Sequence, residues 1–214
     1  MNVKFGVQHG TNIAFTRLKT KDYLKSIKYC EKEGYESVSV MDHLNSLPTN
    51  AEVVSCNIVL TVAASLTEKV RLSSMVSDPH SRHPSQIALD SLTLQCLSNN
   101  RFILGLGAGE GINLNDFGIE VPEELNSSHH WKLSVSEMLA STDASTAFAN
   151  ENVPEEVIES MMISGSSEDC IAQIEEYIEV ADEHFAIQIF AFDNYFNIFE
   201  LFTDKVYGYF KELK

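Results

Sequence analysis

The sequence of 214 residues lacks a long hydrophobic run, a closely spaced cysteine pair and a linker rich in glycine, proline or serine. No apolar run is long enough to span a bilayer, and no signal-peptide hydrophobic segment follows Met1, so we expect a cytoplasmic protein. The four cysteines lie far apart, which favours buried free thiols in a reducing compartment over disulfides. The absence of a linker predicts one domain over residues 1–214.

Basic residues are scarce in the second half of the chain. The net charge is −16, and residues 108–214 hold 4 Lys/Arg against 22 Asp/Glu, whereas residues 1–107 hold 11 against 9. An acidic half repels phosphate backbones and anionic lipid, which argues against a nucleic-acid or membrane partner. The simplest interpretation of this charge is a well-solvated surface.

A regular alternation of strand-like and helix-like segments is present in the first half. The predicted strands are Val3–Gln8, Ser37–Met41, Val70–Val76 and Phe102–Leu106. The predicted helices are Lys21–Glu33, Glu52–Leu66 and a helix from Pro84 to about Leu97. Strand–helix units repeated in this way indicate parallel βαβ construction.

The second half departs from this spacing. Its clear elements are a helix at Ser167–Ala181, a strand at Ala186–Phe192 and a helix at Phe196–Leu213. Weaker patterns lie at Trp131–Ser136 (strand or short helix), Val153–Glu159 (helix) and Met161–Ser164 (a short apolar run). A complete eight-unit barrel takes about 250 residues. We therefore expect an incomplete TIM-barrel-like α/β fold of six to seven parallel strands, shortened between about residues 120 and 160.

Polar residues and glycines gather at the predicted carboxyl ends of the strands, where parallel barrels carry their chemistry. These strand ends are Gln8-His9-Gly10, Asp42-His43, Ser74-Met75-Val76-Ser77-Asp78-Pro79 and Gly105-Leu106-Gly107-Ala108-Gly109-Glu110. A histidine at such a position has a pKa near neutrality, which suits proton transfer at pH 7. A structural alternative is that the Asp42-His43 pair caps a loop and that Glu110 is a surface acid.

Several of these motifs together resemble a known family. The motifs are Val40-Met41-Asp42-His43, then Ser77 to Pro84, then Leu97-Ser98-Asn99-Asn100-Arg101-Phe102 running to Glu110, then Asn113-Leu114 and Phe117-Gly118-Ile119. In this order they resemble the bacterial-luciferase-like monooxygenase superfamily, and most closely its coenzyme F-420 (deazaflavin) branch. The resemblance covers roughly residues 3–119 and resumes at Ile163-Ser164-Gly165-Ser166-Ser167-Glu168-Asp169.

The resemblance implies a flavin- or deazaflavin-dependent oxidoreductase that transfers a hydride to or from a small organic substrate. It implies coenzyme F-420 or FMN as cofactor. His43 matches a proposed catalytic base, and Glu110 matches an acidic residue that could act as a general acid. The positions that match cofactor contacts are Asp42, Ser74, Met75, Gly107, Ala108 and Gly109. Family members often carry a non-prolyl cis peptide at the place of Ser74-Met75, and the strand-end glycines would let the backbone approach the coenzyme ring.

Two other functions stay open from the sequence. A shortened family barrel could be a flavin-binding or dimeric interaction protein without turnover. The glycine pattern Gly105 to Gly111 after a strand also resembles the S-adenosylmethionine loop of methyltransferases, although that loop normally has an acidic residue where this chain has Gly105. A dinucleotide-binding Gly-x-Gly-x-x-Gly motif fits less well, because Glu110 would replace its third glycine.

Three further expectations concern binding partners. A shortened barrel exposes apolar surface, and the stretch from Phe190 to Phe210 is rich in aromatic residues, so we expect a homodimer. The helix start at Gly165-Ser166-Ser167 could bind an anion. The pair His80-x-x-His83 resembles metal ligands but has no evident third ligand, so we expect no metal site.

Overall fold

The structure is a computed structural model of the chain. It describes residues 3–9, 20–44, 53–107, 109, 114–120, 163, 165–180, 184–189 and 194–213. The predictions for Trp131–Ser136 and Val153–Glu159 lie outside the described residues, as does most of Met161–Ser164.

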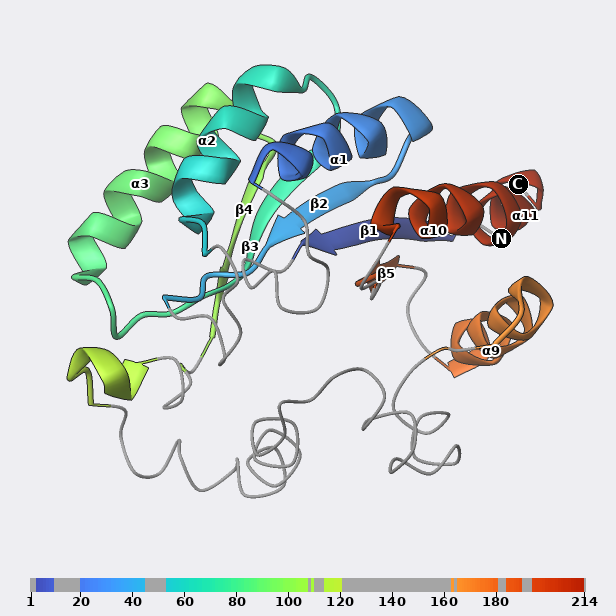
Figure 1. The fold of residues 1–214 in the computed structure, drawn as a ribbon. Helices are drawn as coiled ribbons and strands as arrows, with labels where there is room; N and C mark the ends of the chain where they lie inside the picture. The colour runs from blue at the N-terminus through green and yellow to red at the C-terminus, as the bar shows by residue number, and fades with distance from the viewer. Residues whose placement is uncertain are drawn as a thin grey trace.

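The described residues form one parallel sheet with helices on one of its faces (Figure 1). The strands are β1 (Lys4–His9), β2 (Ser37–Val40), β3 (Arg71–Ser77), β4 (Phe102–Leu106) and β5 (His184–Ile187), in the order β4-β3-β2-β1-β5. The helices between the first four strands are α1 (Thr20–Glu33), α2 (Cys56–Leu66) and α3 (Pro84–Leu97). The predicted βαβ construction is therefore confirmed, with strand boundaries that differ by a residue or two.

The last strand lies beside the first, as the final strand of a closed barrel does. β5 pairs with β1 in the register Lys4↔His184 to Val7↔Ile187. Within the described residues the sheet does not close, because β4 and β5 are its two edges. The expected incomplete α/β barrel is confirmed. The last strand begins two residues earlier than predicted, because its partner β1 extends back to Lys4.

Alternation along the strands separates the core from the open face of the sheet. In β1 and β2, the side chains of Val7, Val38 and Val40 are fully buried toward the helices. The alternating positions carry small or polar residues, among them Gly6, Gln8, Ser37 and Ser39. Adjacent residues of a strand point to opposite faces of the sheet. The face away from the helices therefore carries small and polar side chains.

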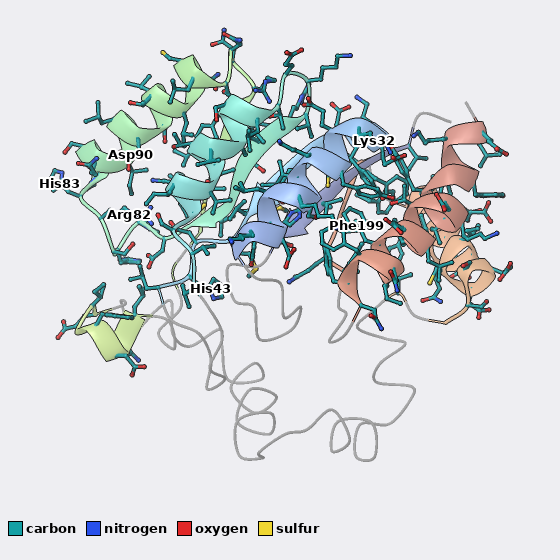
Figure 2. All side chains as sticks on the ribbon, turned by 45° about the horizontal axis from the view of Figure 1, so that its top comes forward. Lys32, His43, Arg82, His83, Asp90 and Phe199 are labelled. Atoms are coloured by element: carbon teal, nitrogen blue, oxygen red, sulfur yellow. The ribbon has the colours of Figure 1, made fainter. Side chains whose placement is uncertain are left out.

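The C-terminal region forms one nearly continuous helical segment, as predicted. It consists of α10 (Tyr195–Leu201), a π-helical stretch at Phe202–Tyr207 and α11 (Gly208–Glu212), and it is preceded in the chain by α9 (Ser167–Val180). Many of its aromatic side chains are buried in the core beside β1 and α1, and Figure 2 labels Phe199 between α1 and these helices.

Two ring contacts show how tightly this region packs. Phe210 lies 5.5 Å from the ring of Phe5 in β1, and Tyr207 stacks on Tyr35 at 4.3 Å. The aromatic C-terminal stretch is therefore an internal packing element. The predicted homodimer stays a prediction, and the apolar side chains that the described part of this segment leaves exposed are Ile198, Leu201 and Tyr209.

The amino ends of the strands are held by two charged side chains. Arg101, just before β4, donates to the carbonyl oxygens of Ala64, Thr67 and Val70 and to the Thr67 hydroxyl at 2.7–3.2 Å. The Glu31 carboxylate accepts from the backbone N–H groups of residues 68–70. Burial tends to raise the pKa of Glu31, but these N–H groups and the positive charge of Arg101 lower it overall. This end of the sheet is consequently a structural one.

No helix among the described residues is long and apolar enough to cross a membrane.

Candidate functional site

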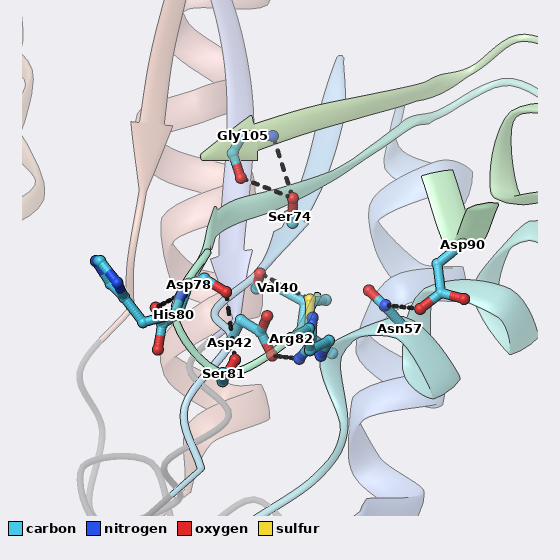
Figure 3. Close-up of polar contacts among 11 residues, drawn as sticks. Val40, Asp42, Asn57, Ser74, Asp78, His80, Ser81, Arg82, Asp90 and Gly105 are labelled. Carbon is cyan, nitrogen blue, oxygen red and sulfur yellow. Dashed lines mark hydrogen bonds and ion pairs between the residues drawn. The ribbon is translucent and has the colours of Figure 1, made fainter. Parts of the chain in front are cut away.

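The carboxyl ends of β2, β3 and β4 bring most of the predicted site residues to one edge of the sheet. Asp42 and His43 follow β2, and Ser74 and Met75 lie near the end of β3. Gly107 directly follows β4. Figure 2 labels His43 and Arg82 near this edge, and Figure 3 draws the polar contacts around it.

An ion pair joins the end of β2 to the turn after β3. Arg82 Nη2 donates to Asp42 Oδ1 at 2.6 Å, and the two side chains are 21% and 3% exposed. Asp42 Oδ2 is buried and has no hydrogen-bond partner among the described residues. Burial tends to lower the pKa of Arg82, but its hydrogen bond to the Asp42 carboxylate raises it overall. One oxygen of Asp42 is therefore fixed, and the other is left to accept from a further donor.

The turn that carries Arg82 is itself held by Asp78. Asp78 Oδ1 accepts from the backbone N–H of His80 at 2.7 Å, and its carbonyl oxygen accepts from the Ser81 hydroxyl at 3.2 Å. Asp78 is buried and, like Asp42, has an Oδ2 atom to which no other described residue donates a hydrogen bond. These contacts lie directly between β3 and α3, so they determine where the Arg82 side chain begins.

His83 ends the same turn and starts α3. Its Nδ1 atom accepts from the backbone N–H of Ser85 at 3.2 Å, so it caps the helix, and Pro84 occupies the first turn as predicted. The described residues contain no group of three or more side chains arranged to hold a metal ion.

Ser74 and Met75 have different environments although they are neighbours. Ser74 is buried, and its hydroxyl both donates to the carbonyl oxygen and accepts from the N–H of Gly105 in β4 at 3.1 Å. Met75 is 38% exposed, and its carbonyl oxygen accepts from Gln8 Nε2 at 3.0 Å. Ser74 therefore joins the two strands, whereas the side chain of Met75 is partly exposed, and the predicted coenzyme contacts of both residues stay predictions.

A non-prolyl cis peptide bond is present, as the family resemblance implied, but between Met75 and Val76. The expected place, Ser74-Met75, is wrong by one residue. The shift coincides with an irregular register between β3 and β4, where the pairing passes from Ser74 directly to Ser77.

The glycines at the end of β4 make room for the neighbouring β3 segment. A Cβ atom on Gly105 would collide with the Ser74 carbonyl oxygen, and one on Gly107 would collide with the Val76 side chain. Gly109 has φ +85° and lies against His80. Contacts within the protein are therefore enough to require glycine at positions 105 and 107, and the approach of a coenzyme ring to Gly107 and Gly109 stays a prediction.

Of the predicted acid–base pair, the structure describes His43 but not Glu110. His43 is half-buried at the end of β2 and makes contacts of its own. Glu110 and Ala108 lie outside the described residues. A shared site of His43, Ser74 and Glu110 therefore stays a prediction.

His9, at the end of β1, belongs to the core and not to this site. It is buried, and its Nε2 atom lies 2.7 Å from the Ser26 hydroxyl of α1. Burial lowers the pKa of His9 to about 4, so the ring is neutral at pH 7. Its neighbour Gln8 points to the opposite face because strand residues alternate.

The start of α9 already contains a carboxylate. Asp169 Oδ2 accepts from the backbone N–H and the hydroxyl of Ser166, and the Asp169 N–H donates back to that hydroxyl, which is a capping box. Both donors of Ser166, which the sequence suggested for an anion, therefore bind a carboxylate of the chain itself.

Sequence reasoning missed the partnership of Asp42 with Arg82. Arg82 was visible only as part of the motif from Ser77 to Pro84, and nothing in its spacing indicates that it reaches back 40 residues. The available signal was the neighbouring proline and histidine, which predict that the turn after β3 ends in a helix start.

Comparison with known families decides the relationship. The model of the luciferase-like monooxygenase family matches residues 4–131, which is more than half of the chain. The chain belongs to this family. The match includes β1 to β4 and the strand-end residues described above, so the luciferase-like resemblance seen in the sequence is confirmed.

Two curated relatives are enzymes named for coenzyme F-420 or a pterin substrate. The 5,10-methylenetetrahydromethanopterin reductase of Methanopyrus kandleri is 33% identical over 96 residues, covering 45% of this chain and 26% of the relative. The F-420-dependent glucose-6-phosphate dehydrogenase of Beutenbergia cavernae is 35% identical over 105 residues, covering 48% and 31%. The aligned part of this luciferase-like chain thus corresponds to less than a third of each relative.

A solved structure matches nearly the whole chain. The monooxygenase RslO1 from Streptomyces bottropensis superposes with a TM-score of 0.67 over 97% of this chain and 99% of its own, at 13% identity. At this identity the likeness is one of fold. The luciferase-like chain therefore shares its fold with a protein of similar length.

Proposed function

We propose that this luciferase-like protein is an oxidoreductase that uses coenzyme F-420 or FMN and transfers a hydride to or from a small organic substrate. The observation that carries the proposal is the position of Asp42 and His43 beside the end of β3. There Asp42 Oδ2 is buried and has no partner within the described ranges. The F-420-dependent relatives, which match this half of the chain at about a third identity, support the deazaflavin.

The residues present fit a planar ring coenzyme. Met75 and Val76 are 38% and 47% exposed at the end of β3, so they offer apolar surface for a ring to rest on. Asp42 Oδ2 could accept a hydrogen bond from a polar edge of that ring. The coenzyme would supply the site that accepts or donates the hydride.

The chain's own residues would handle the proton. When an alcohol carbon loses a hydride, its hydroxyl must lose a proton, and His43 is the residue we assign to take it. In the reverse direction His43 would return the proton to the carbonyl oxygen. Glu110 is our proposed second acid, and Gly107, Ala108 and Gly109 our proposed lining of the same edge.

One observation favours a second candidate, a non-catalytic coenzyme-binding or interaction protein. Because Gly105 and Gly107 are required by Ser74 and Val76, their presence does not depend on a bound coenzyme. The same contacts remove the reason for the methyltransferase hypothesis, and membership of the luciferase-like family leaves it without support.

We also propose that the protein is a cytoplasmic homodimer with a single domain. Its four cysteines are free thiols, as in a reducing compartment. The large apolar side chains Ile58 of α2 and Leu89 and Leu92 of α3 are 67%, 59% and 66% exposed, and we call them the α2–α3 surface. α2 has no charged residue, and the single charge of α3, Asp90, is bound by Asn57 and Gln86. A second copy, despite its net charge of −16, could approach this surface with little repulsion.

The experiment that tests the function is a titration of the purified protein with F-420 and with FMN, followed by ring fluorescence. We expect binding of one of them, and reduction of F-420 by a candidate alcohol or sugar phosphate that is lost in His43→Ala while binding remains. Binding without turnover for wild type across substrates would favour the non-catalytic candidate. Binding of neither coenzyme would refute the proposal.

A further inference from the structure

The Asp42–Arg82 pair has a geometry that a simple structural ion pair does not require. Both partners are largely buried, at 3% and 21% side-chain exposure, yet in the part of the chain that the structure describes only Oδ1 of Asp42 has a partner. Leaving the other oxygen of a buried carboxylate without a donor is costly, so such atoms in native proteins usually have a role. Here the atom lies at the carboxyl end of a strand, where ligands bind in this kind of fold.

Arg82 is well suited to hold that carboxylate in one orientation. Its guanidinium is planar and permanently charged, so a single short contact defines direction as well as attraction. The base of its side chain is fixed by the Asp78 turn on one side and by the His83 cap of α3 on the other. A rotation of the Asp42 carboxylate would break the 2.6 Å contact and bury an unpaired guanidinium.

We propose that Arg82 is a positioning residue, which holds Asp42 through Oδ1 so that Oδ2 is presented as a hydrogen-bond acceptor to the bound coenzyme. This inference rests on the proposed function, because it requires a coenzyme at the carboxyl ends of β2 and β3. It assigns Arg82 no direct contact with substrate or coenzyme.

The chain contains a matched control for this role. Arg101 is also partly buried and makes four hydrogen bonds, but it lies at the amino ends of the strands and bonds to residues 64–70. Replacing it should cost stability without touching the carboxyl edge. Comparison of the two arginines therefore separates positioning from general support.

The test is to titrate wild type and five variants with F-420 and with FMN, and to record the thermal unfolding curve of each protein. The variants are Arg82→Met, Arg82→Lys, Asp42→Asn, Asp42→Asn/Arg82→Met and Arg101→Met. We expect Arg82→Met to weaken coenzyme binding roughly tenfold, as the loss of one charge-assisted hydrogen bond would. Arg82→Lys should recover part of the lost affinity, because lysine keeps the positive charge but lacks the planar guanidinium group. Arg101→Met should lower Tm and leave the Kd of the folded protein unchanged.

The double variant decides whether Arg82 acts through Asp42. We expect Asp42→Asn/Arg82→Met to bind coenzyme as well as Asp42→Asn alone, and this comparison remains decisive if Arg82→Met by itself does not fold. Additive losses, an unchanged Kd in Arg82→Met, or an equal loss in Arg101→Met would overturn the positioning role and leave the proposed function standing. A wild type that binds neither coenzyme would overturn both.

Discussion

At the scale of single residues, the face of the strand decides what a side chain can do. Gln8 and His9 are neighbours at the end of β1. Gln8 donates to the Met75 carbonyl oxygen, whereas His9 contacts the Ser26 hydroxyl of α1 on the other face of the sheet. Asp42 shows the same control by environment, since its two oxygens differ only in whether Arg82 reaches them. Residue type alone therefore does not distinguish a core histidine from one that could carry chemistry.

The buried His9 makes stability depend on pH. The pKa of His9 is about 4 in the folded chain, against 6.5 when the ring is exposed. Between pH 4 and pH 6.5, therefore, His9 is protonated in the unfolded chain and neutral in the folded chain. The contribution of neutral His9 is fully present above pH 6.5 and is lost as the pH falls toward 4, by on the order of 3 kcal/mol. Urea unfolding at pH 7.0, 6.0, 5.0 and 4.5 measures this loss.

A His9→Gln variant provides the control, because glutamine can contact Ser26 but does not titrate. Its free energy of unfolding should fall less than that of wild type over the same pH range. The ring of Tyr23, 5.9 Å away, is uncharged throughout the range. Parallel pH curves for wild type and His9→Gln would contradict the assignment.

At the scale of elements, β3 and β4 are matched in shape where they meet. β3 departs from regular pairing between Ser74 and Ser77. Two glycines face this irregularity, Gly105 in β4 and Gly107 directly after it. The Val76 side chain occupies the space left by Gly105 and Gly107. The strand-end glycines are thus a packing feature that shapes the edge of the candidate site.

This packing predicts a compensating pair of substitutions. Gly107→Ala should destabilise the protein by about 1–3 kcal/mol, because its methyl group collides with the Val76 side chain. Val76→Ala in the same chain should recover most of that loss, since it removes the colliding methyl groups. Denaturant unfolding of the two single variants and the double variant measures the coupling. Additive losses would show that Gly107 is required for another reason.

At the scale of the whole molecule, the exposed apolar side chains of α2 and α3 form a surface with little charge. The α2–α3 surface presents large apolar side chains, while the aromatic C-terminal segment is turned into the core. Apolar surface is normally buried against another element or another chain. We therefore propose the α2–α3 surface as the dimer contact, a candidate in addition to the C-terminal region that the composition suggested.

The proposed homodimer predicts a monomer when this surface is charged. Leu89→Arg/Leu92→Arg should shift the sedimentation coefficient from dimer to monomer at micromolar concentration, because each arginine would be buried unpaired in the interface. Leu201→Arg is the matched control, since Leu201 is 49% exposed on α10, and it should leave the dimer intact. A monomeric wild type at high micromolar concentration would rule the dimer out.

Local pattern determined much of this protein. The spacing of Val38 and Val40 on β2, the Pro84 helix start and the Ser166 cap of α9 are set by nearby residues, so the βαβ order and the family resemblance were readable from the sequence. Only the tertiary structure decided which strand-end residues meet. Arg82 reaches Asp42 across 40 residues, Val76 selects Gly107, and Phe210 packs on Phe5 across almost the whole chain. Such contacts depend on the three-dimensional course of the backbone, which no local period encodes.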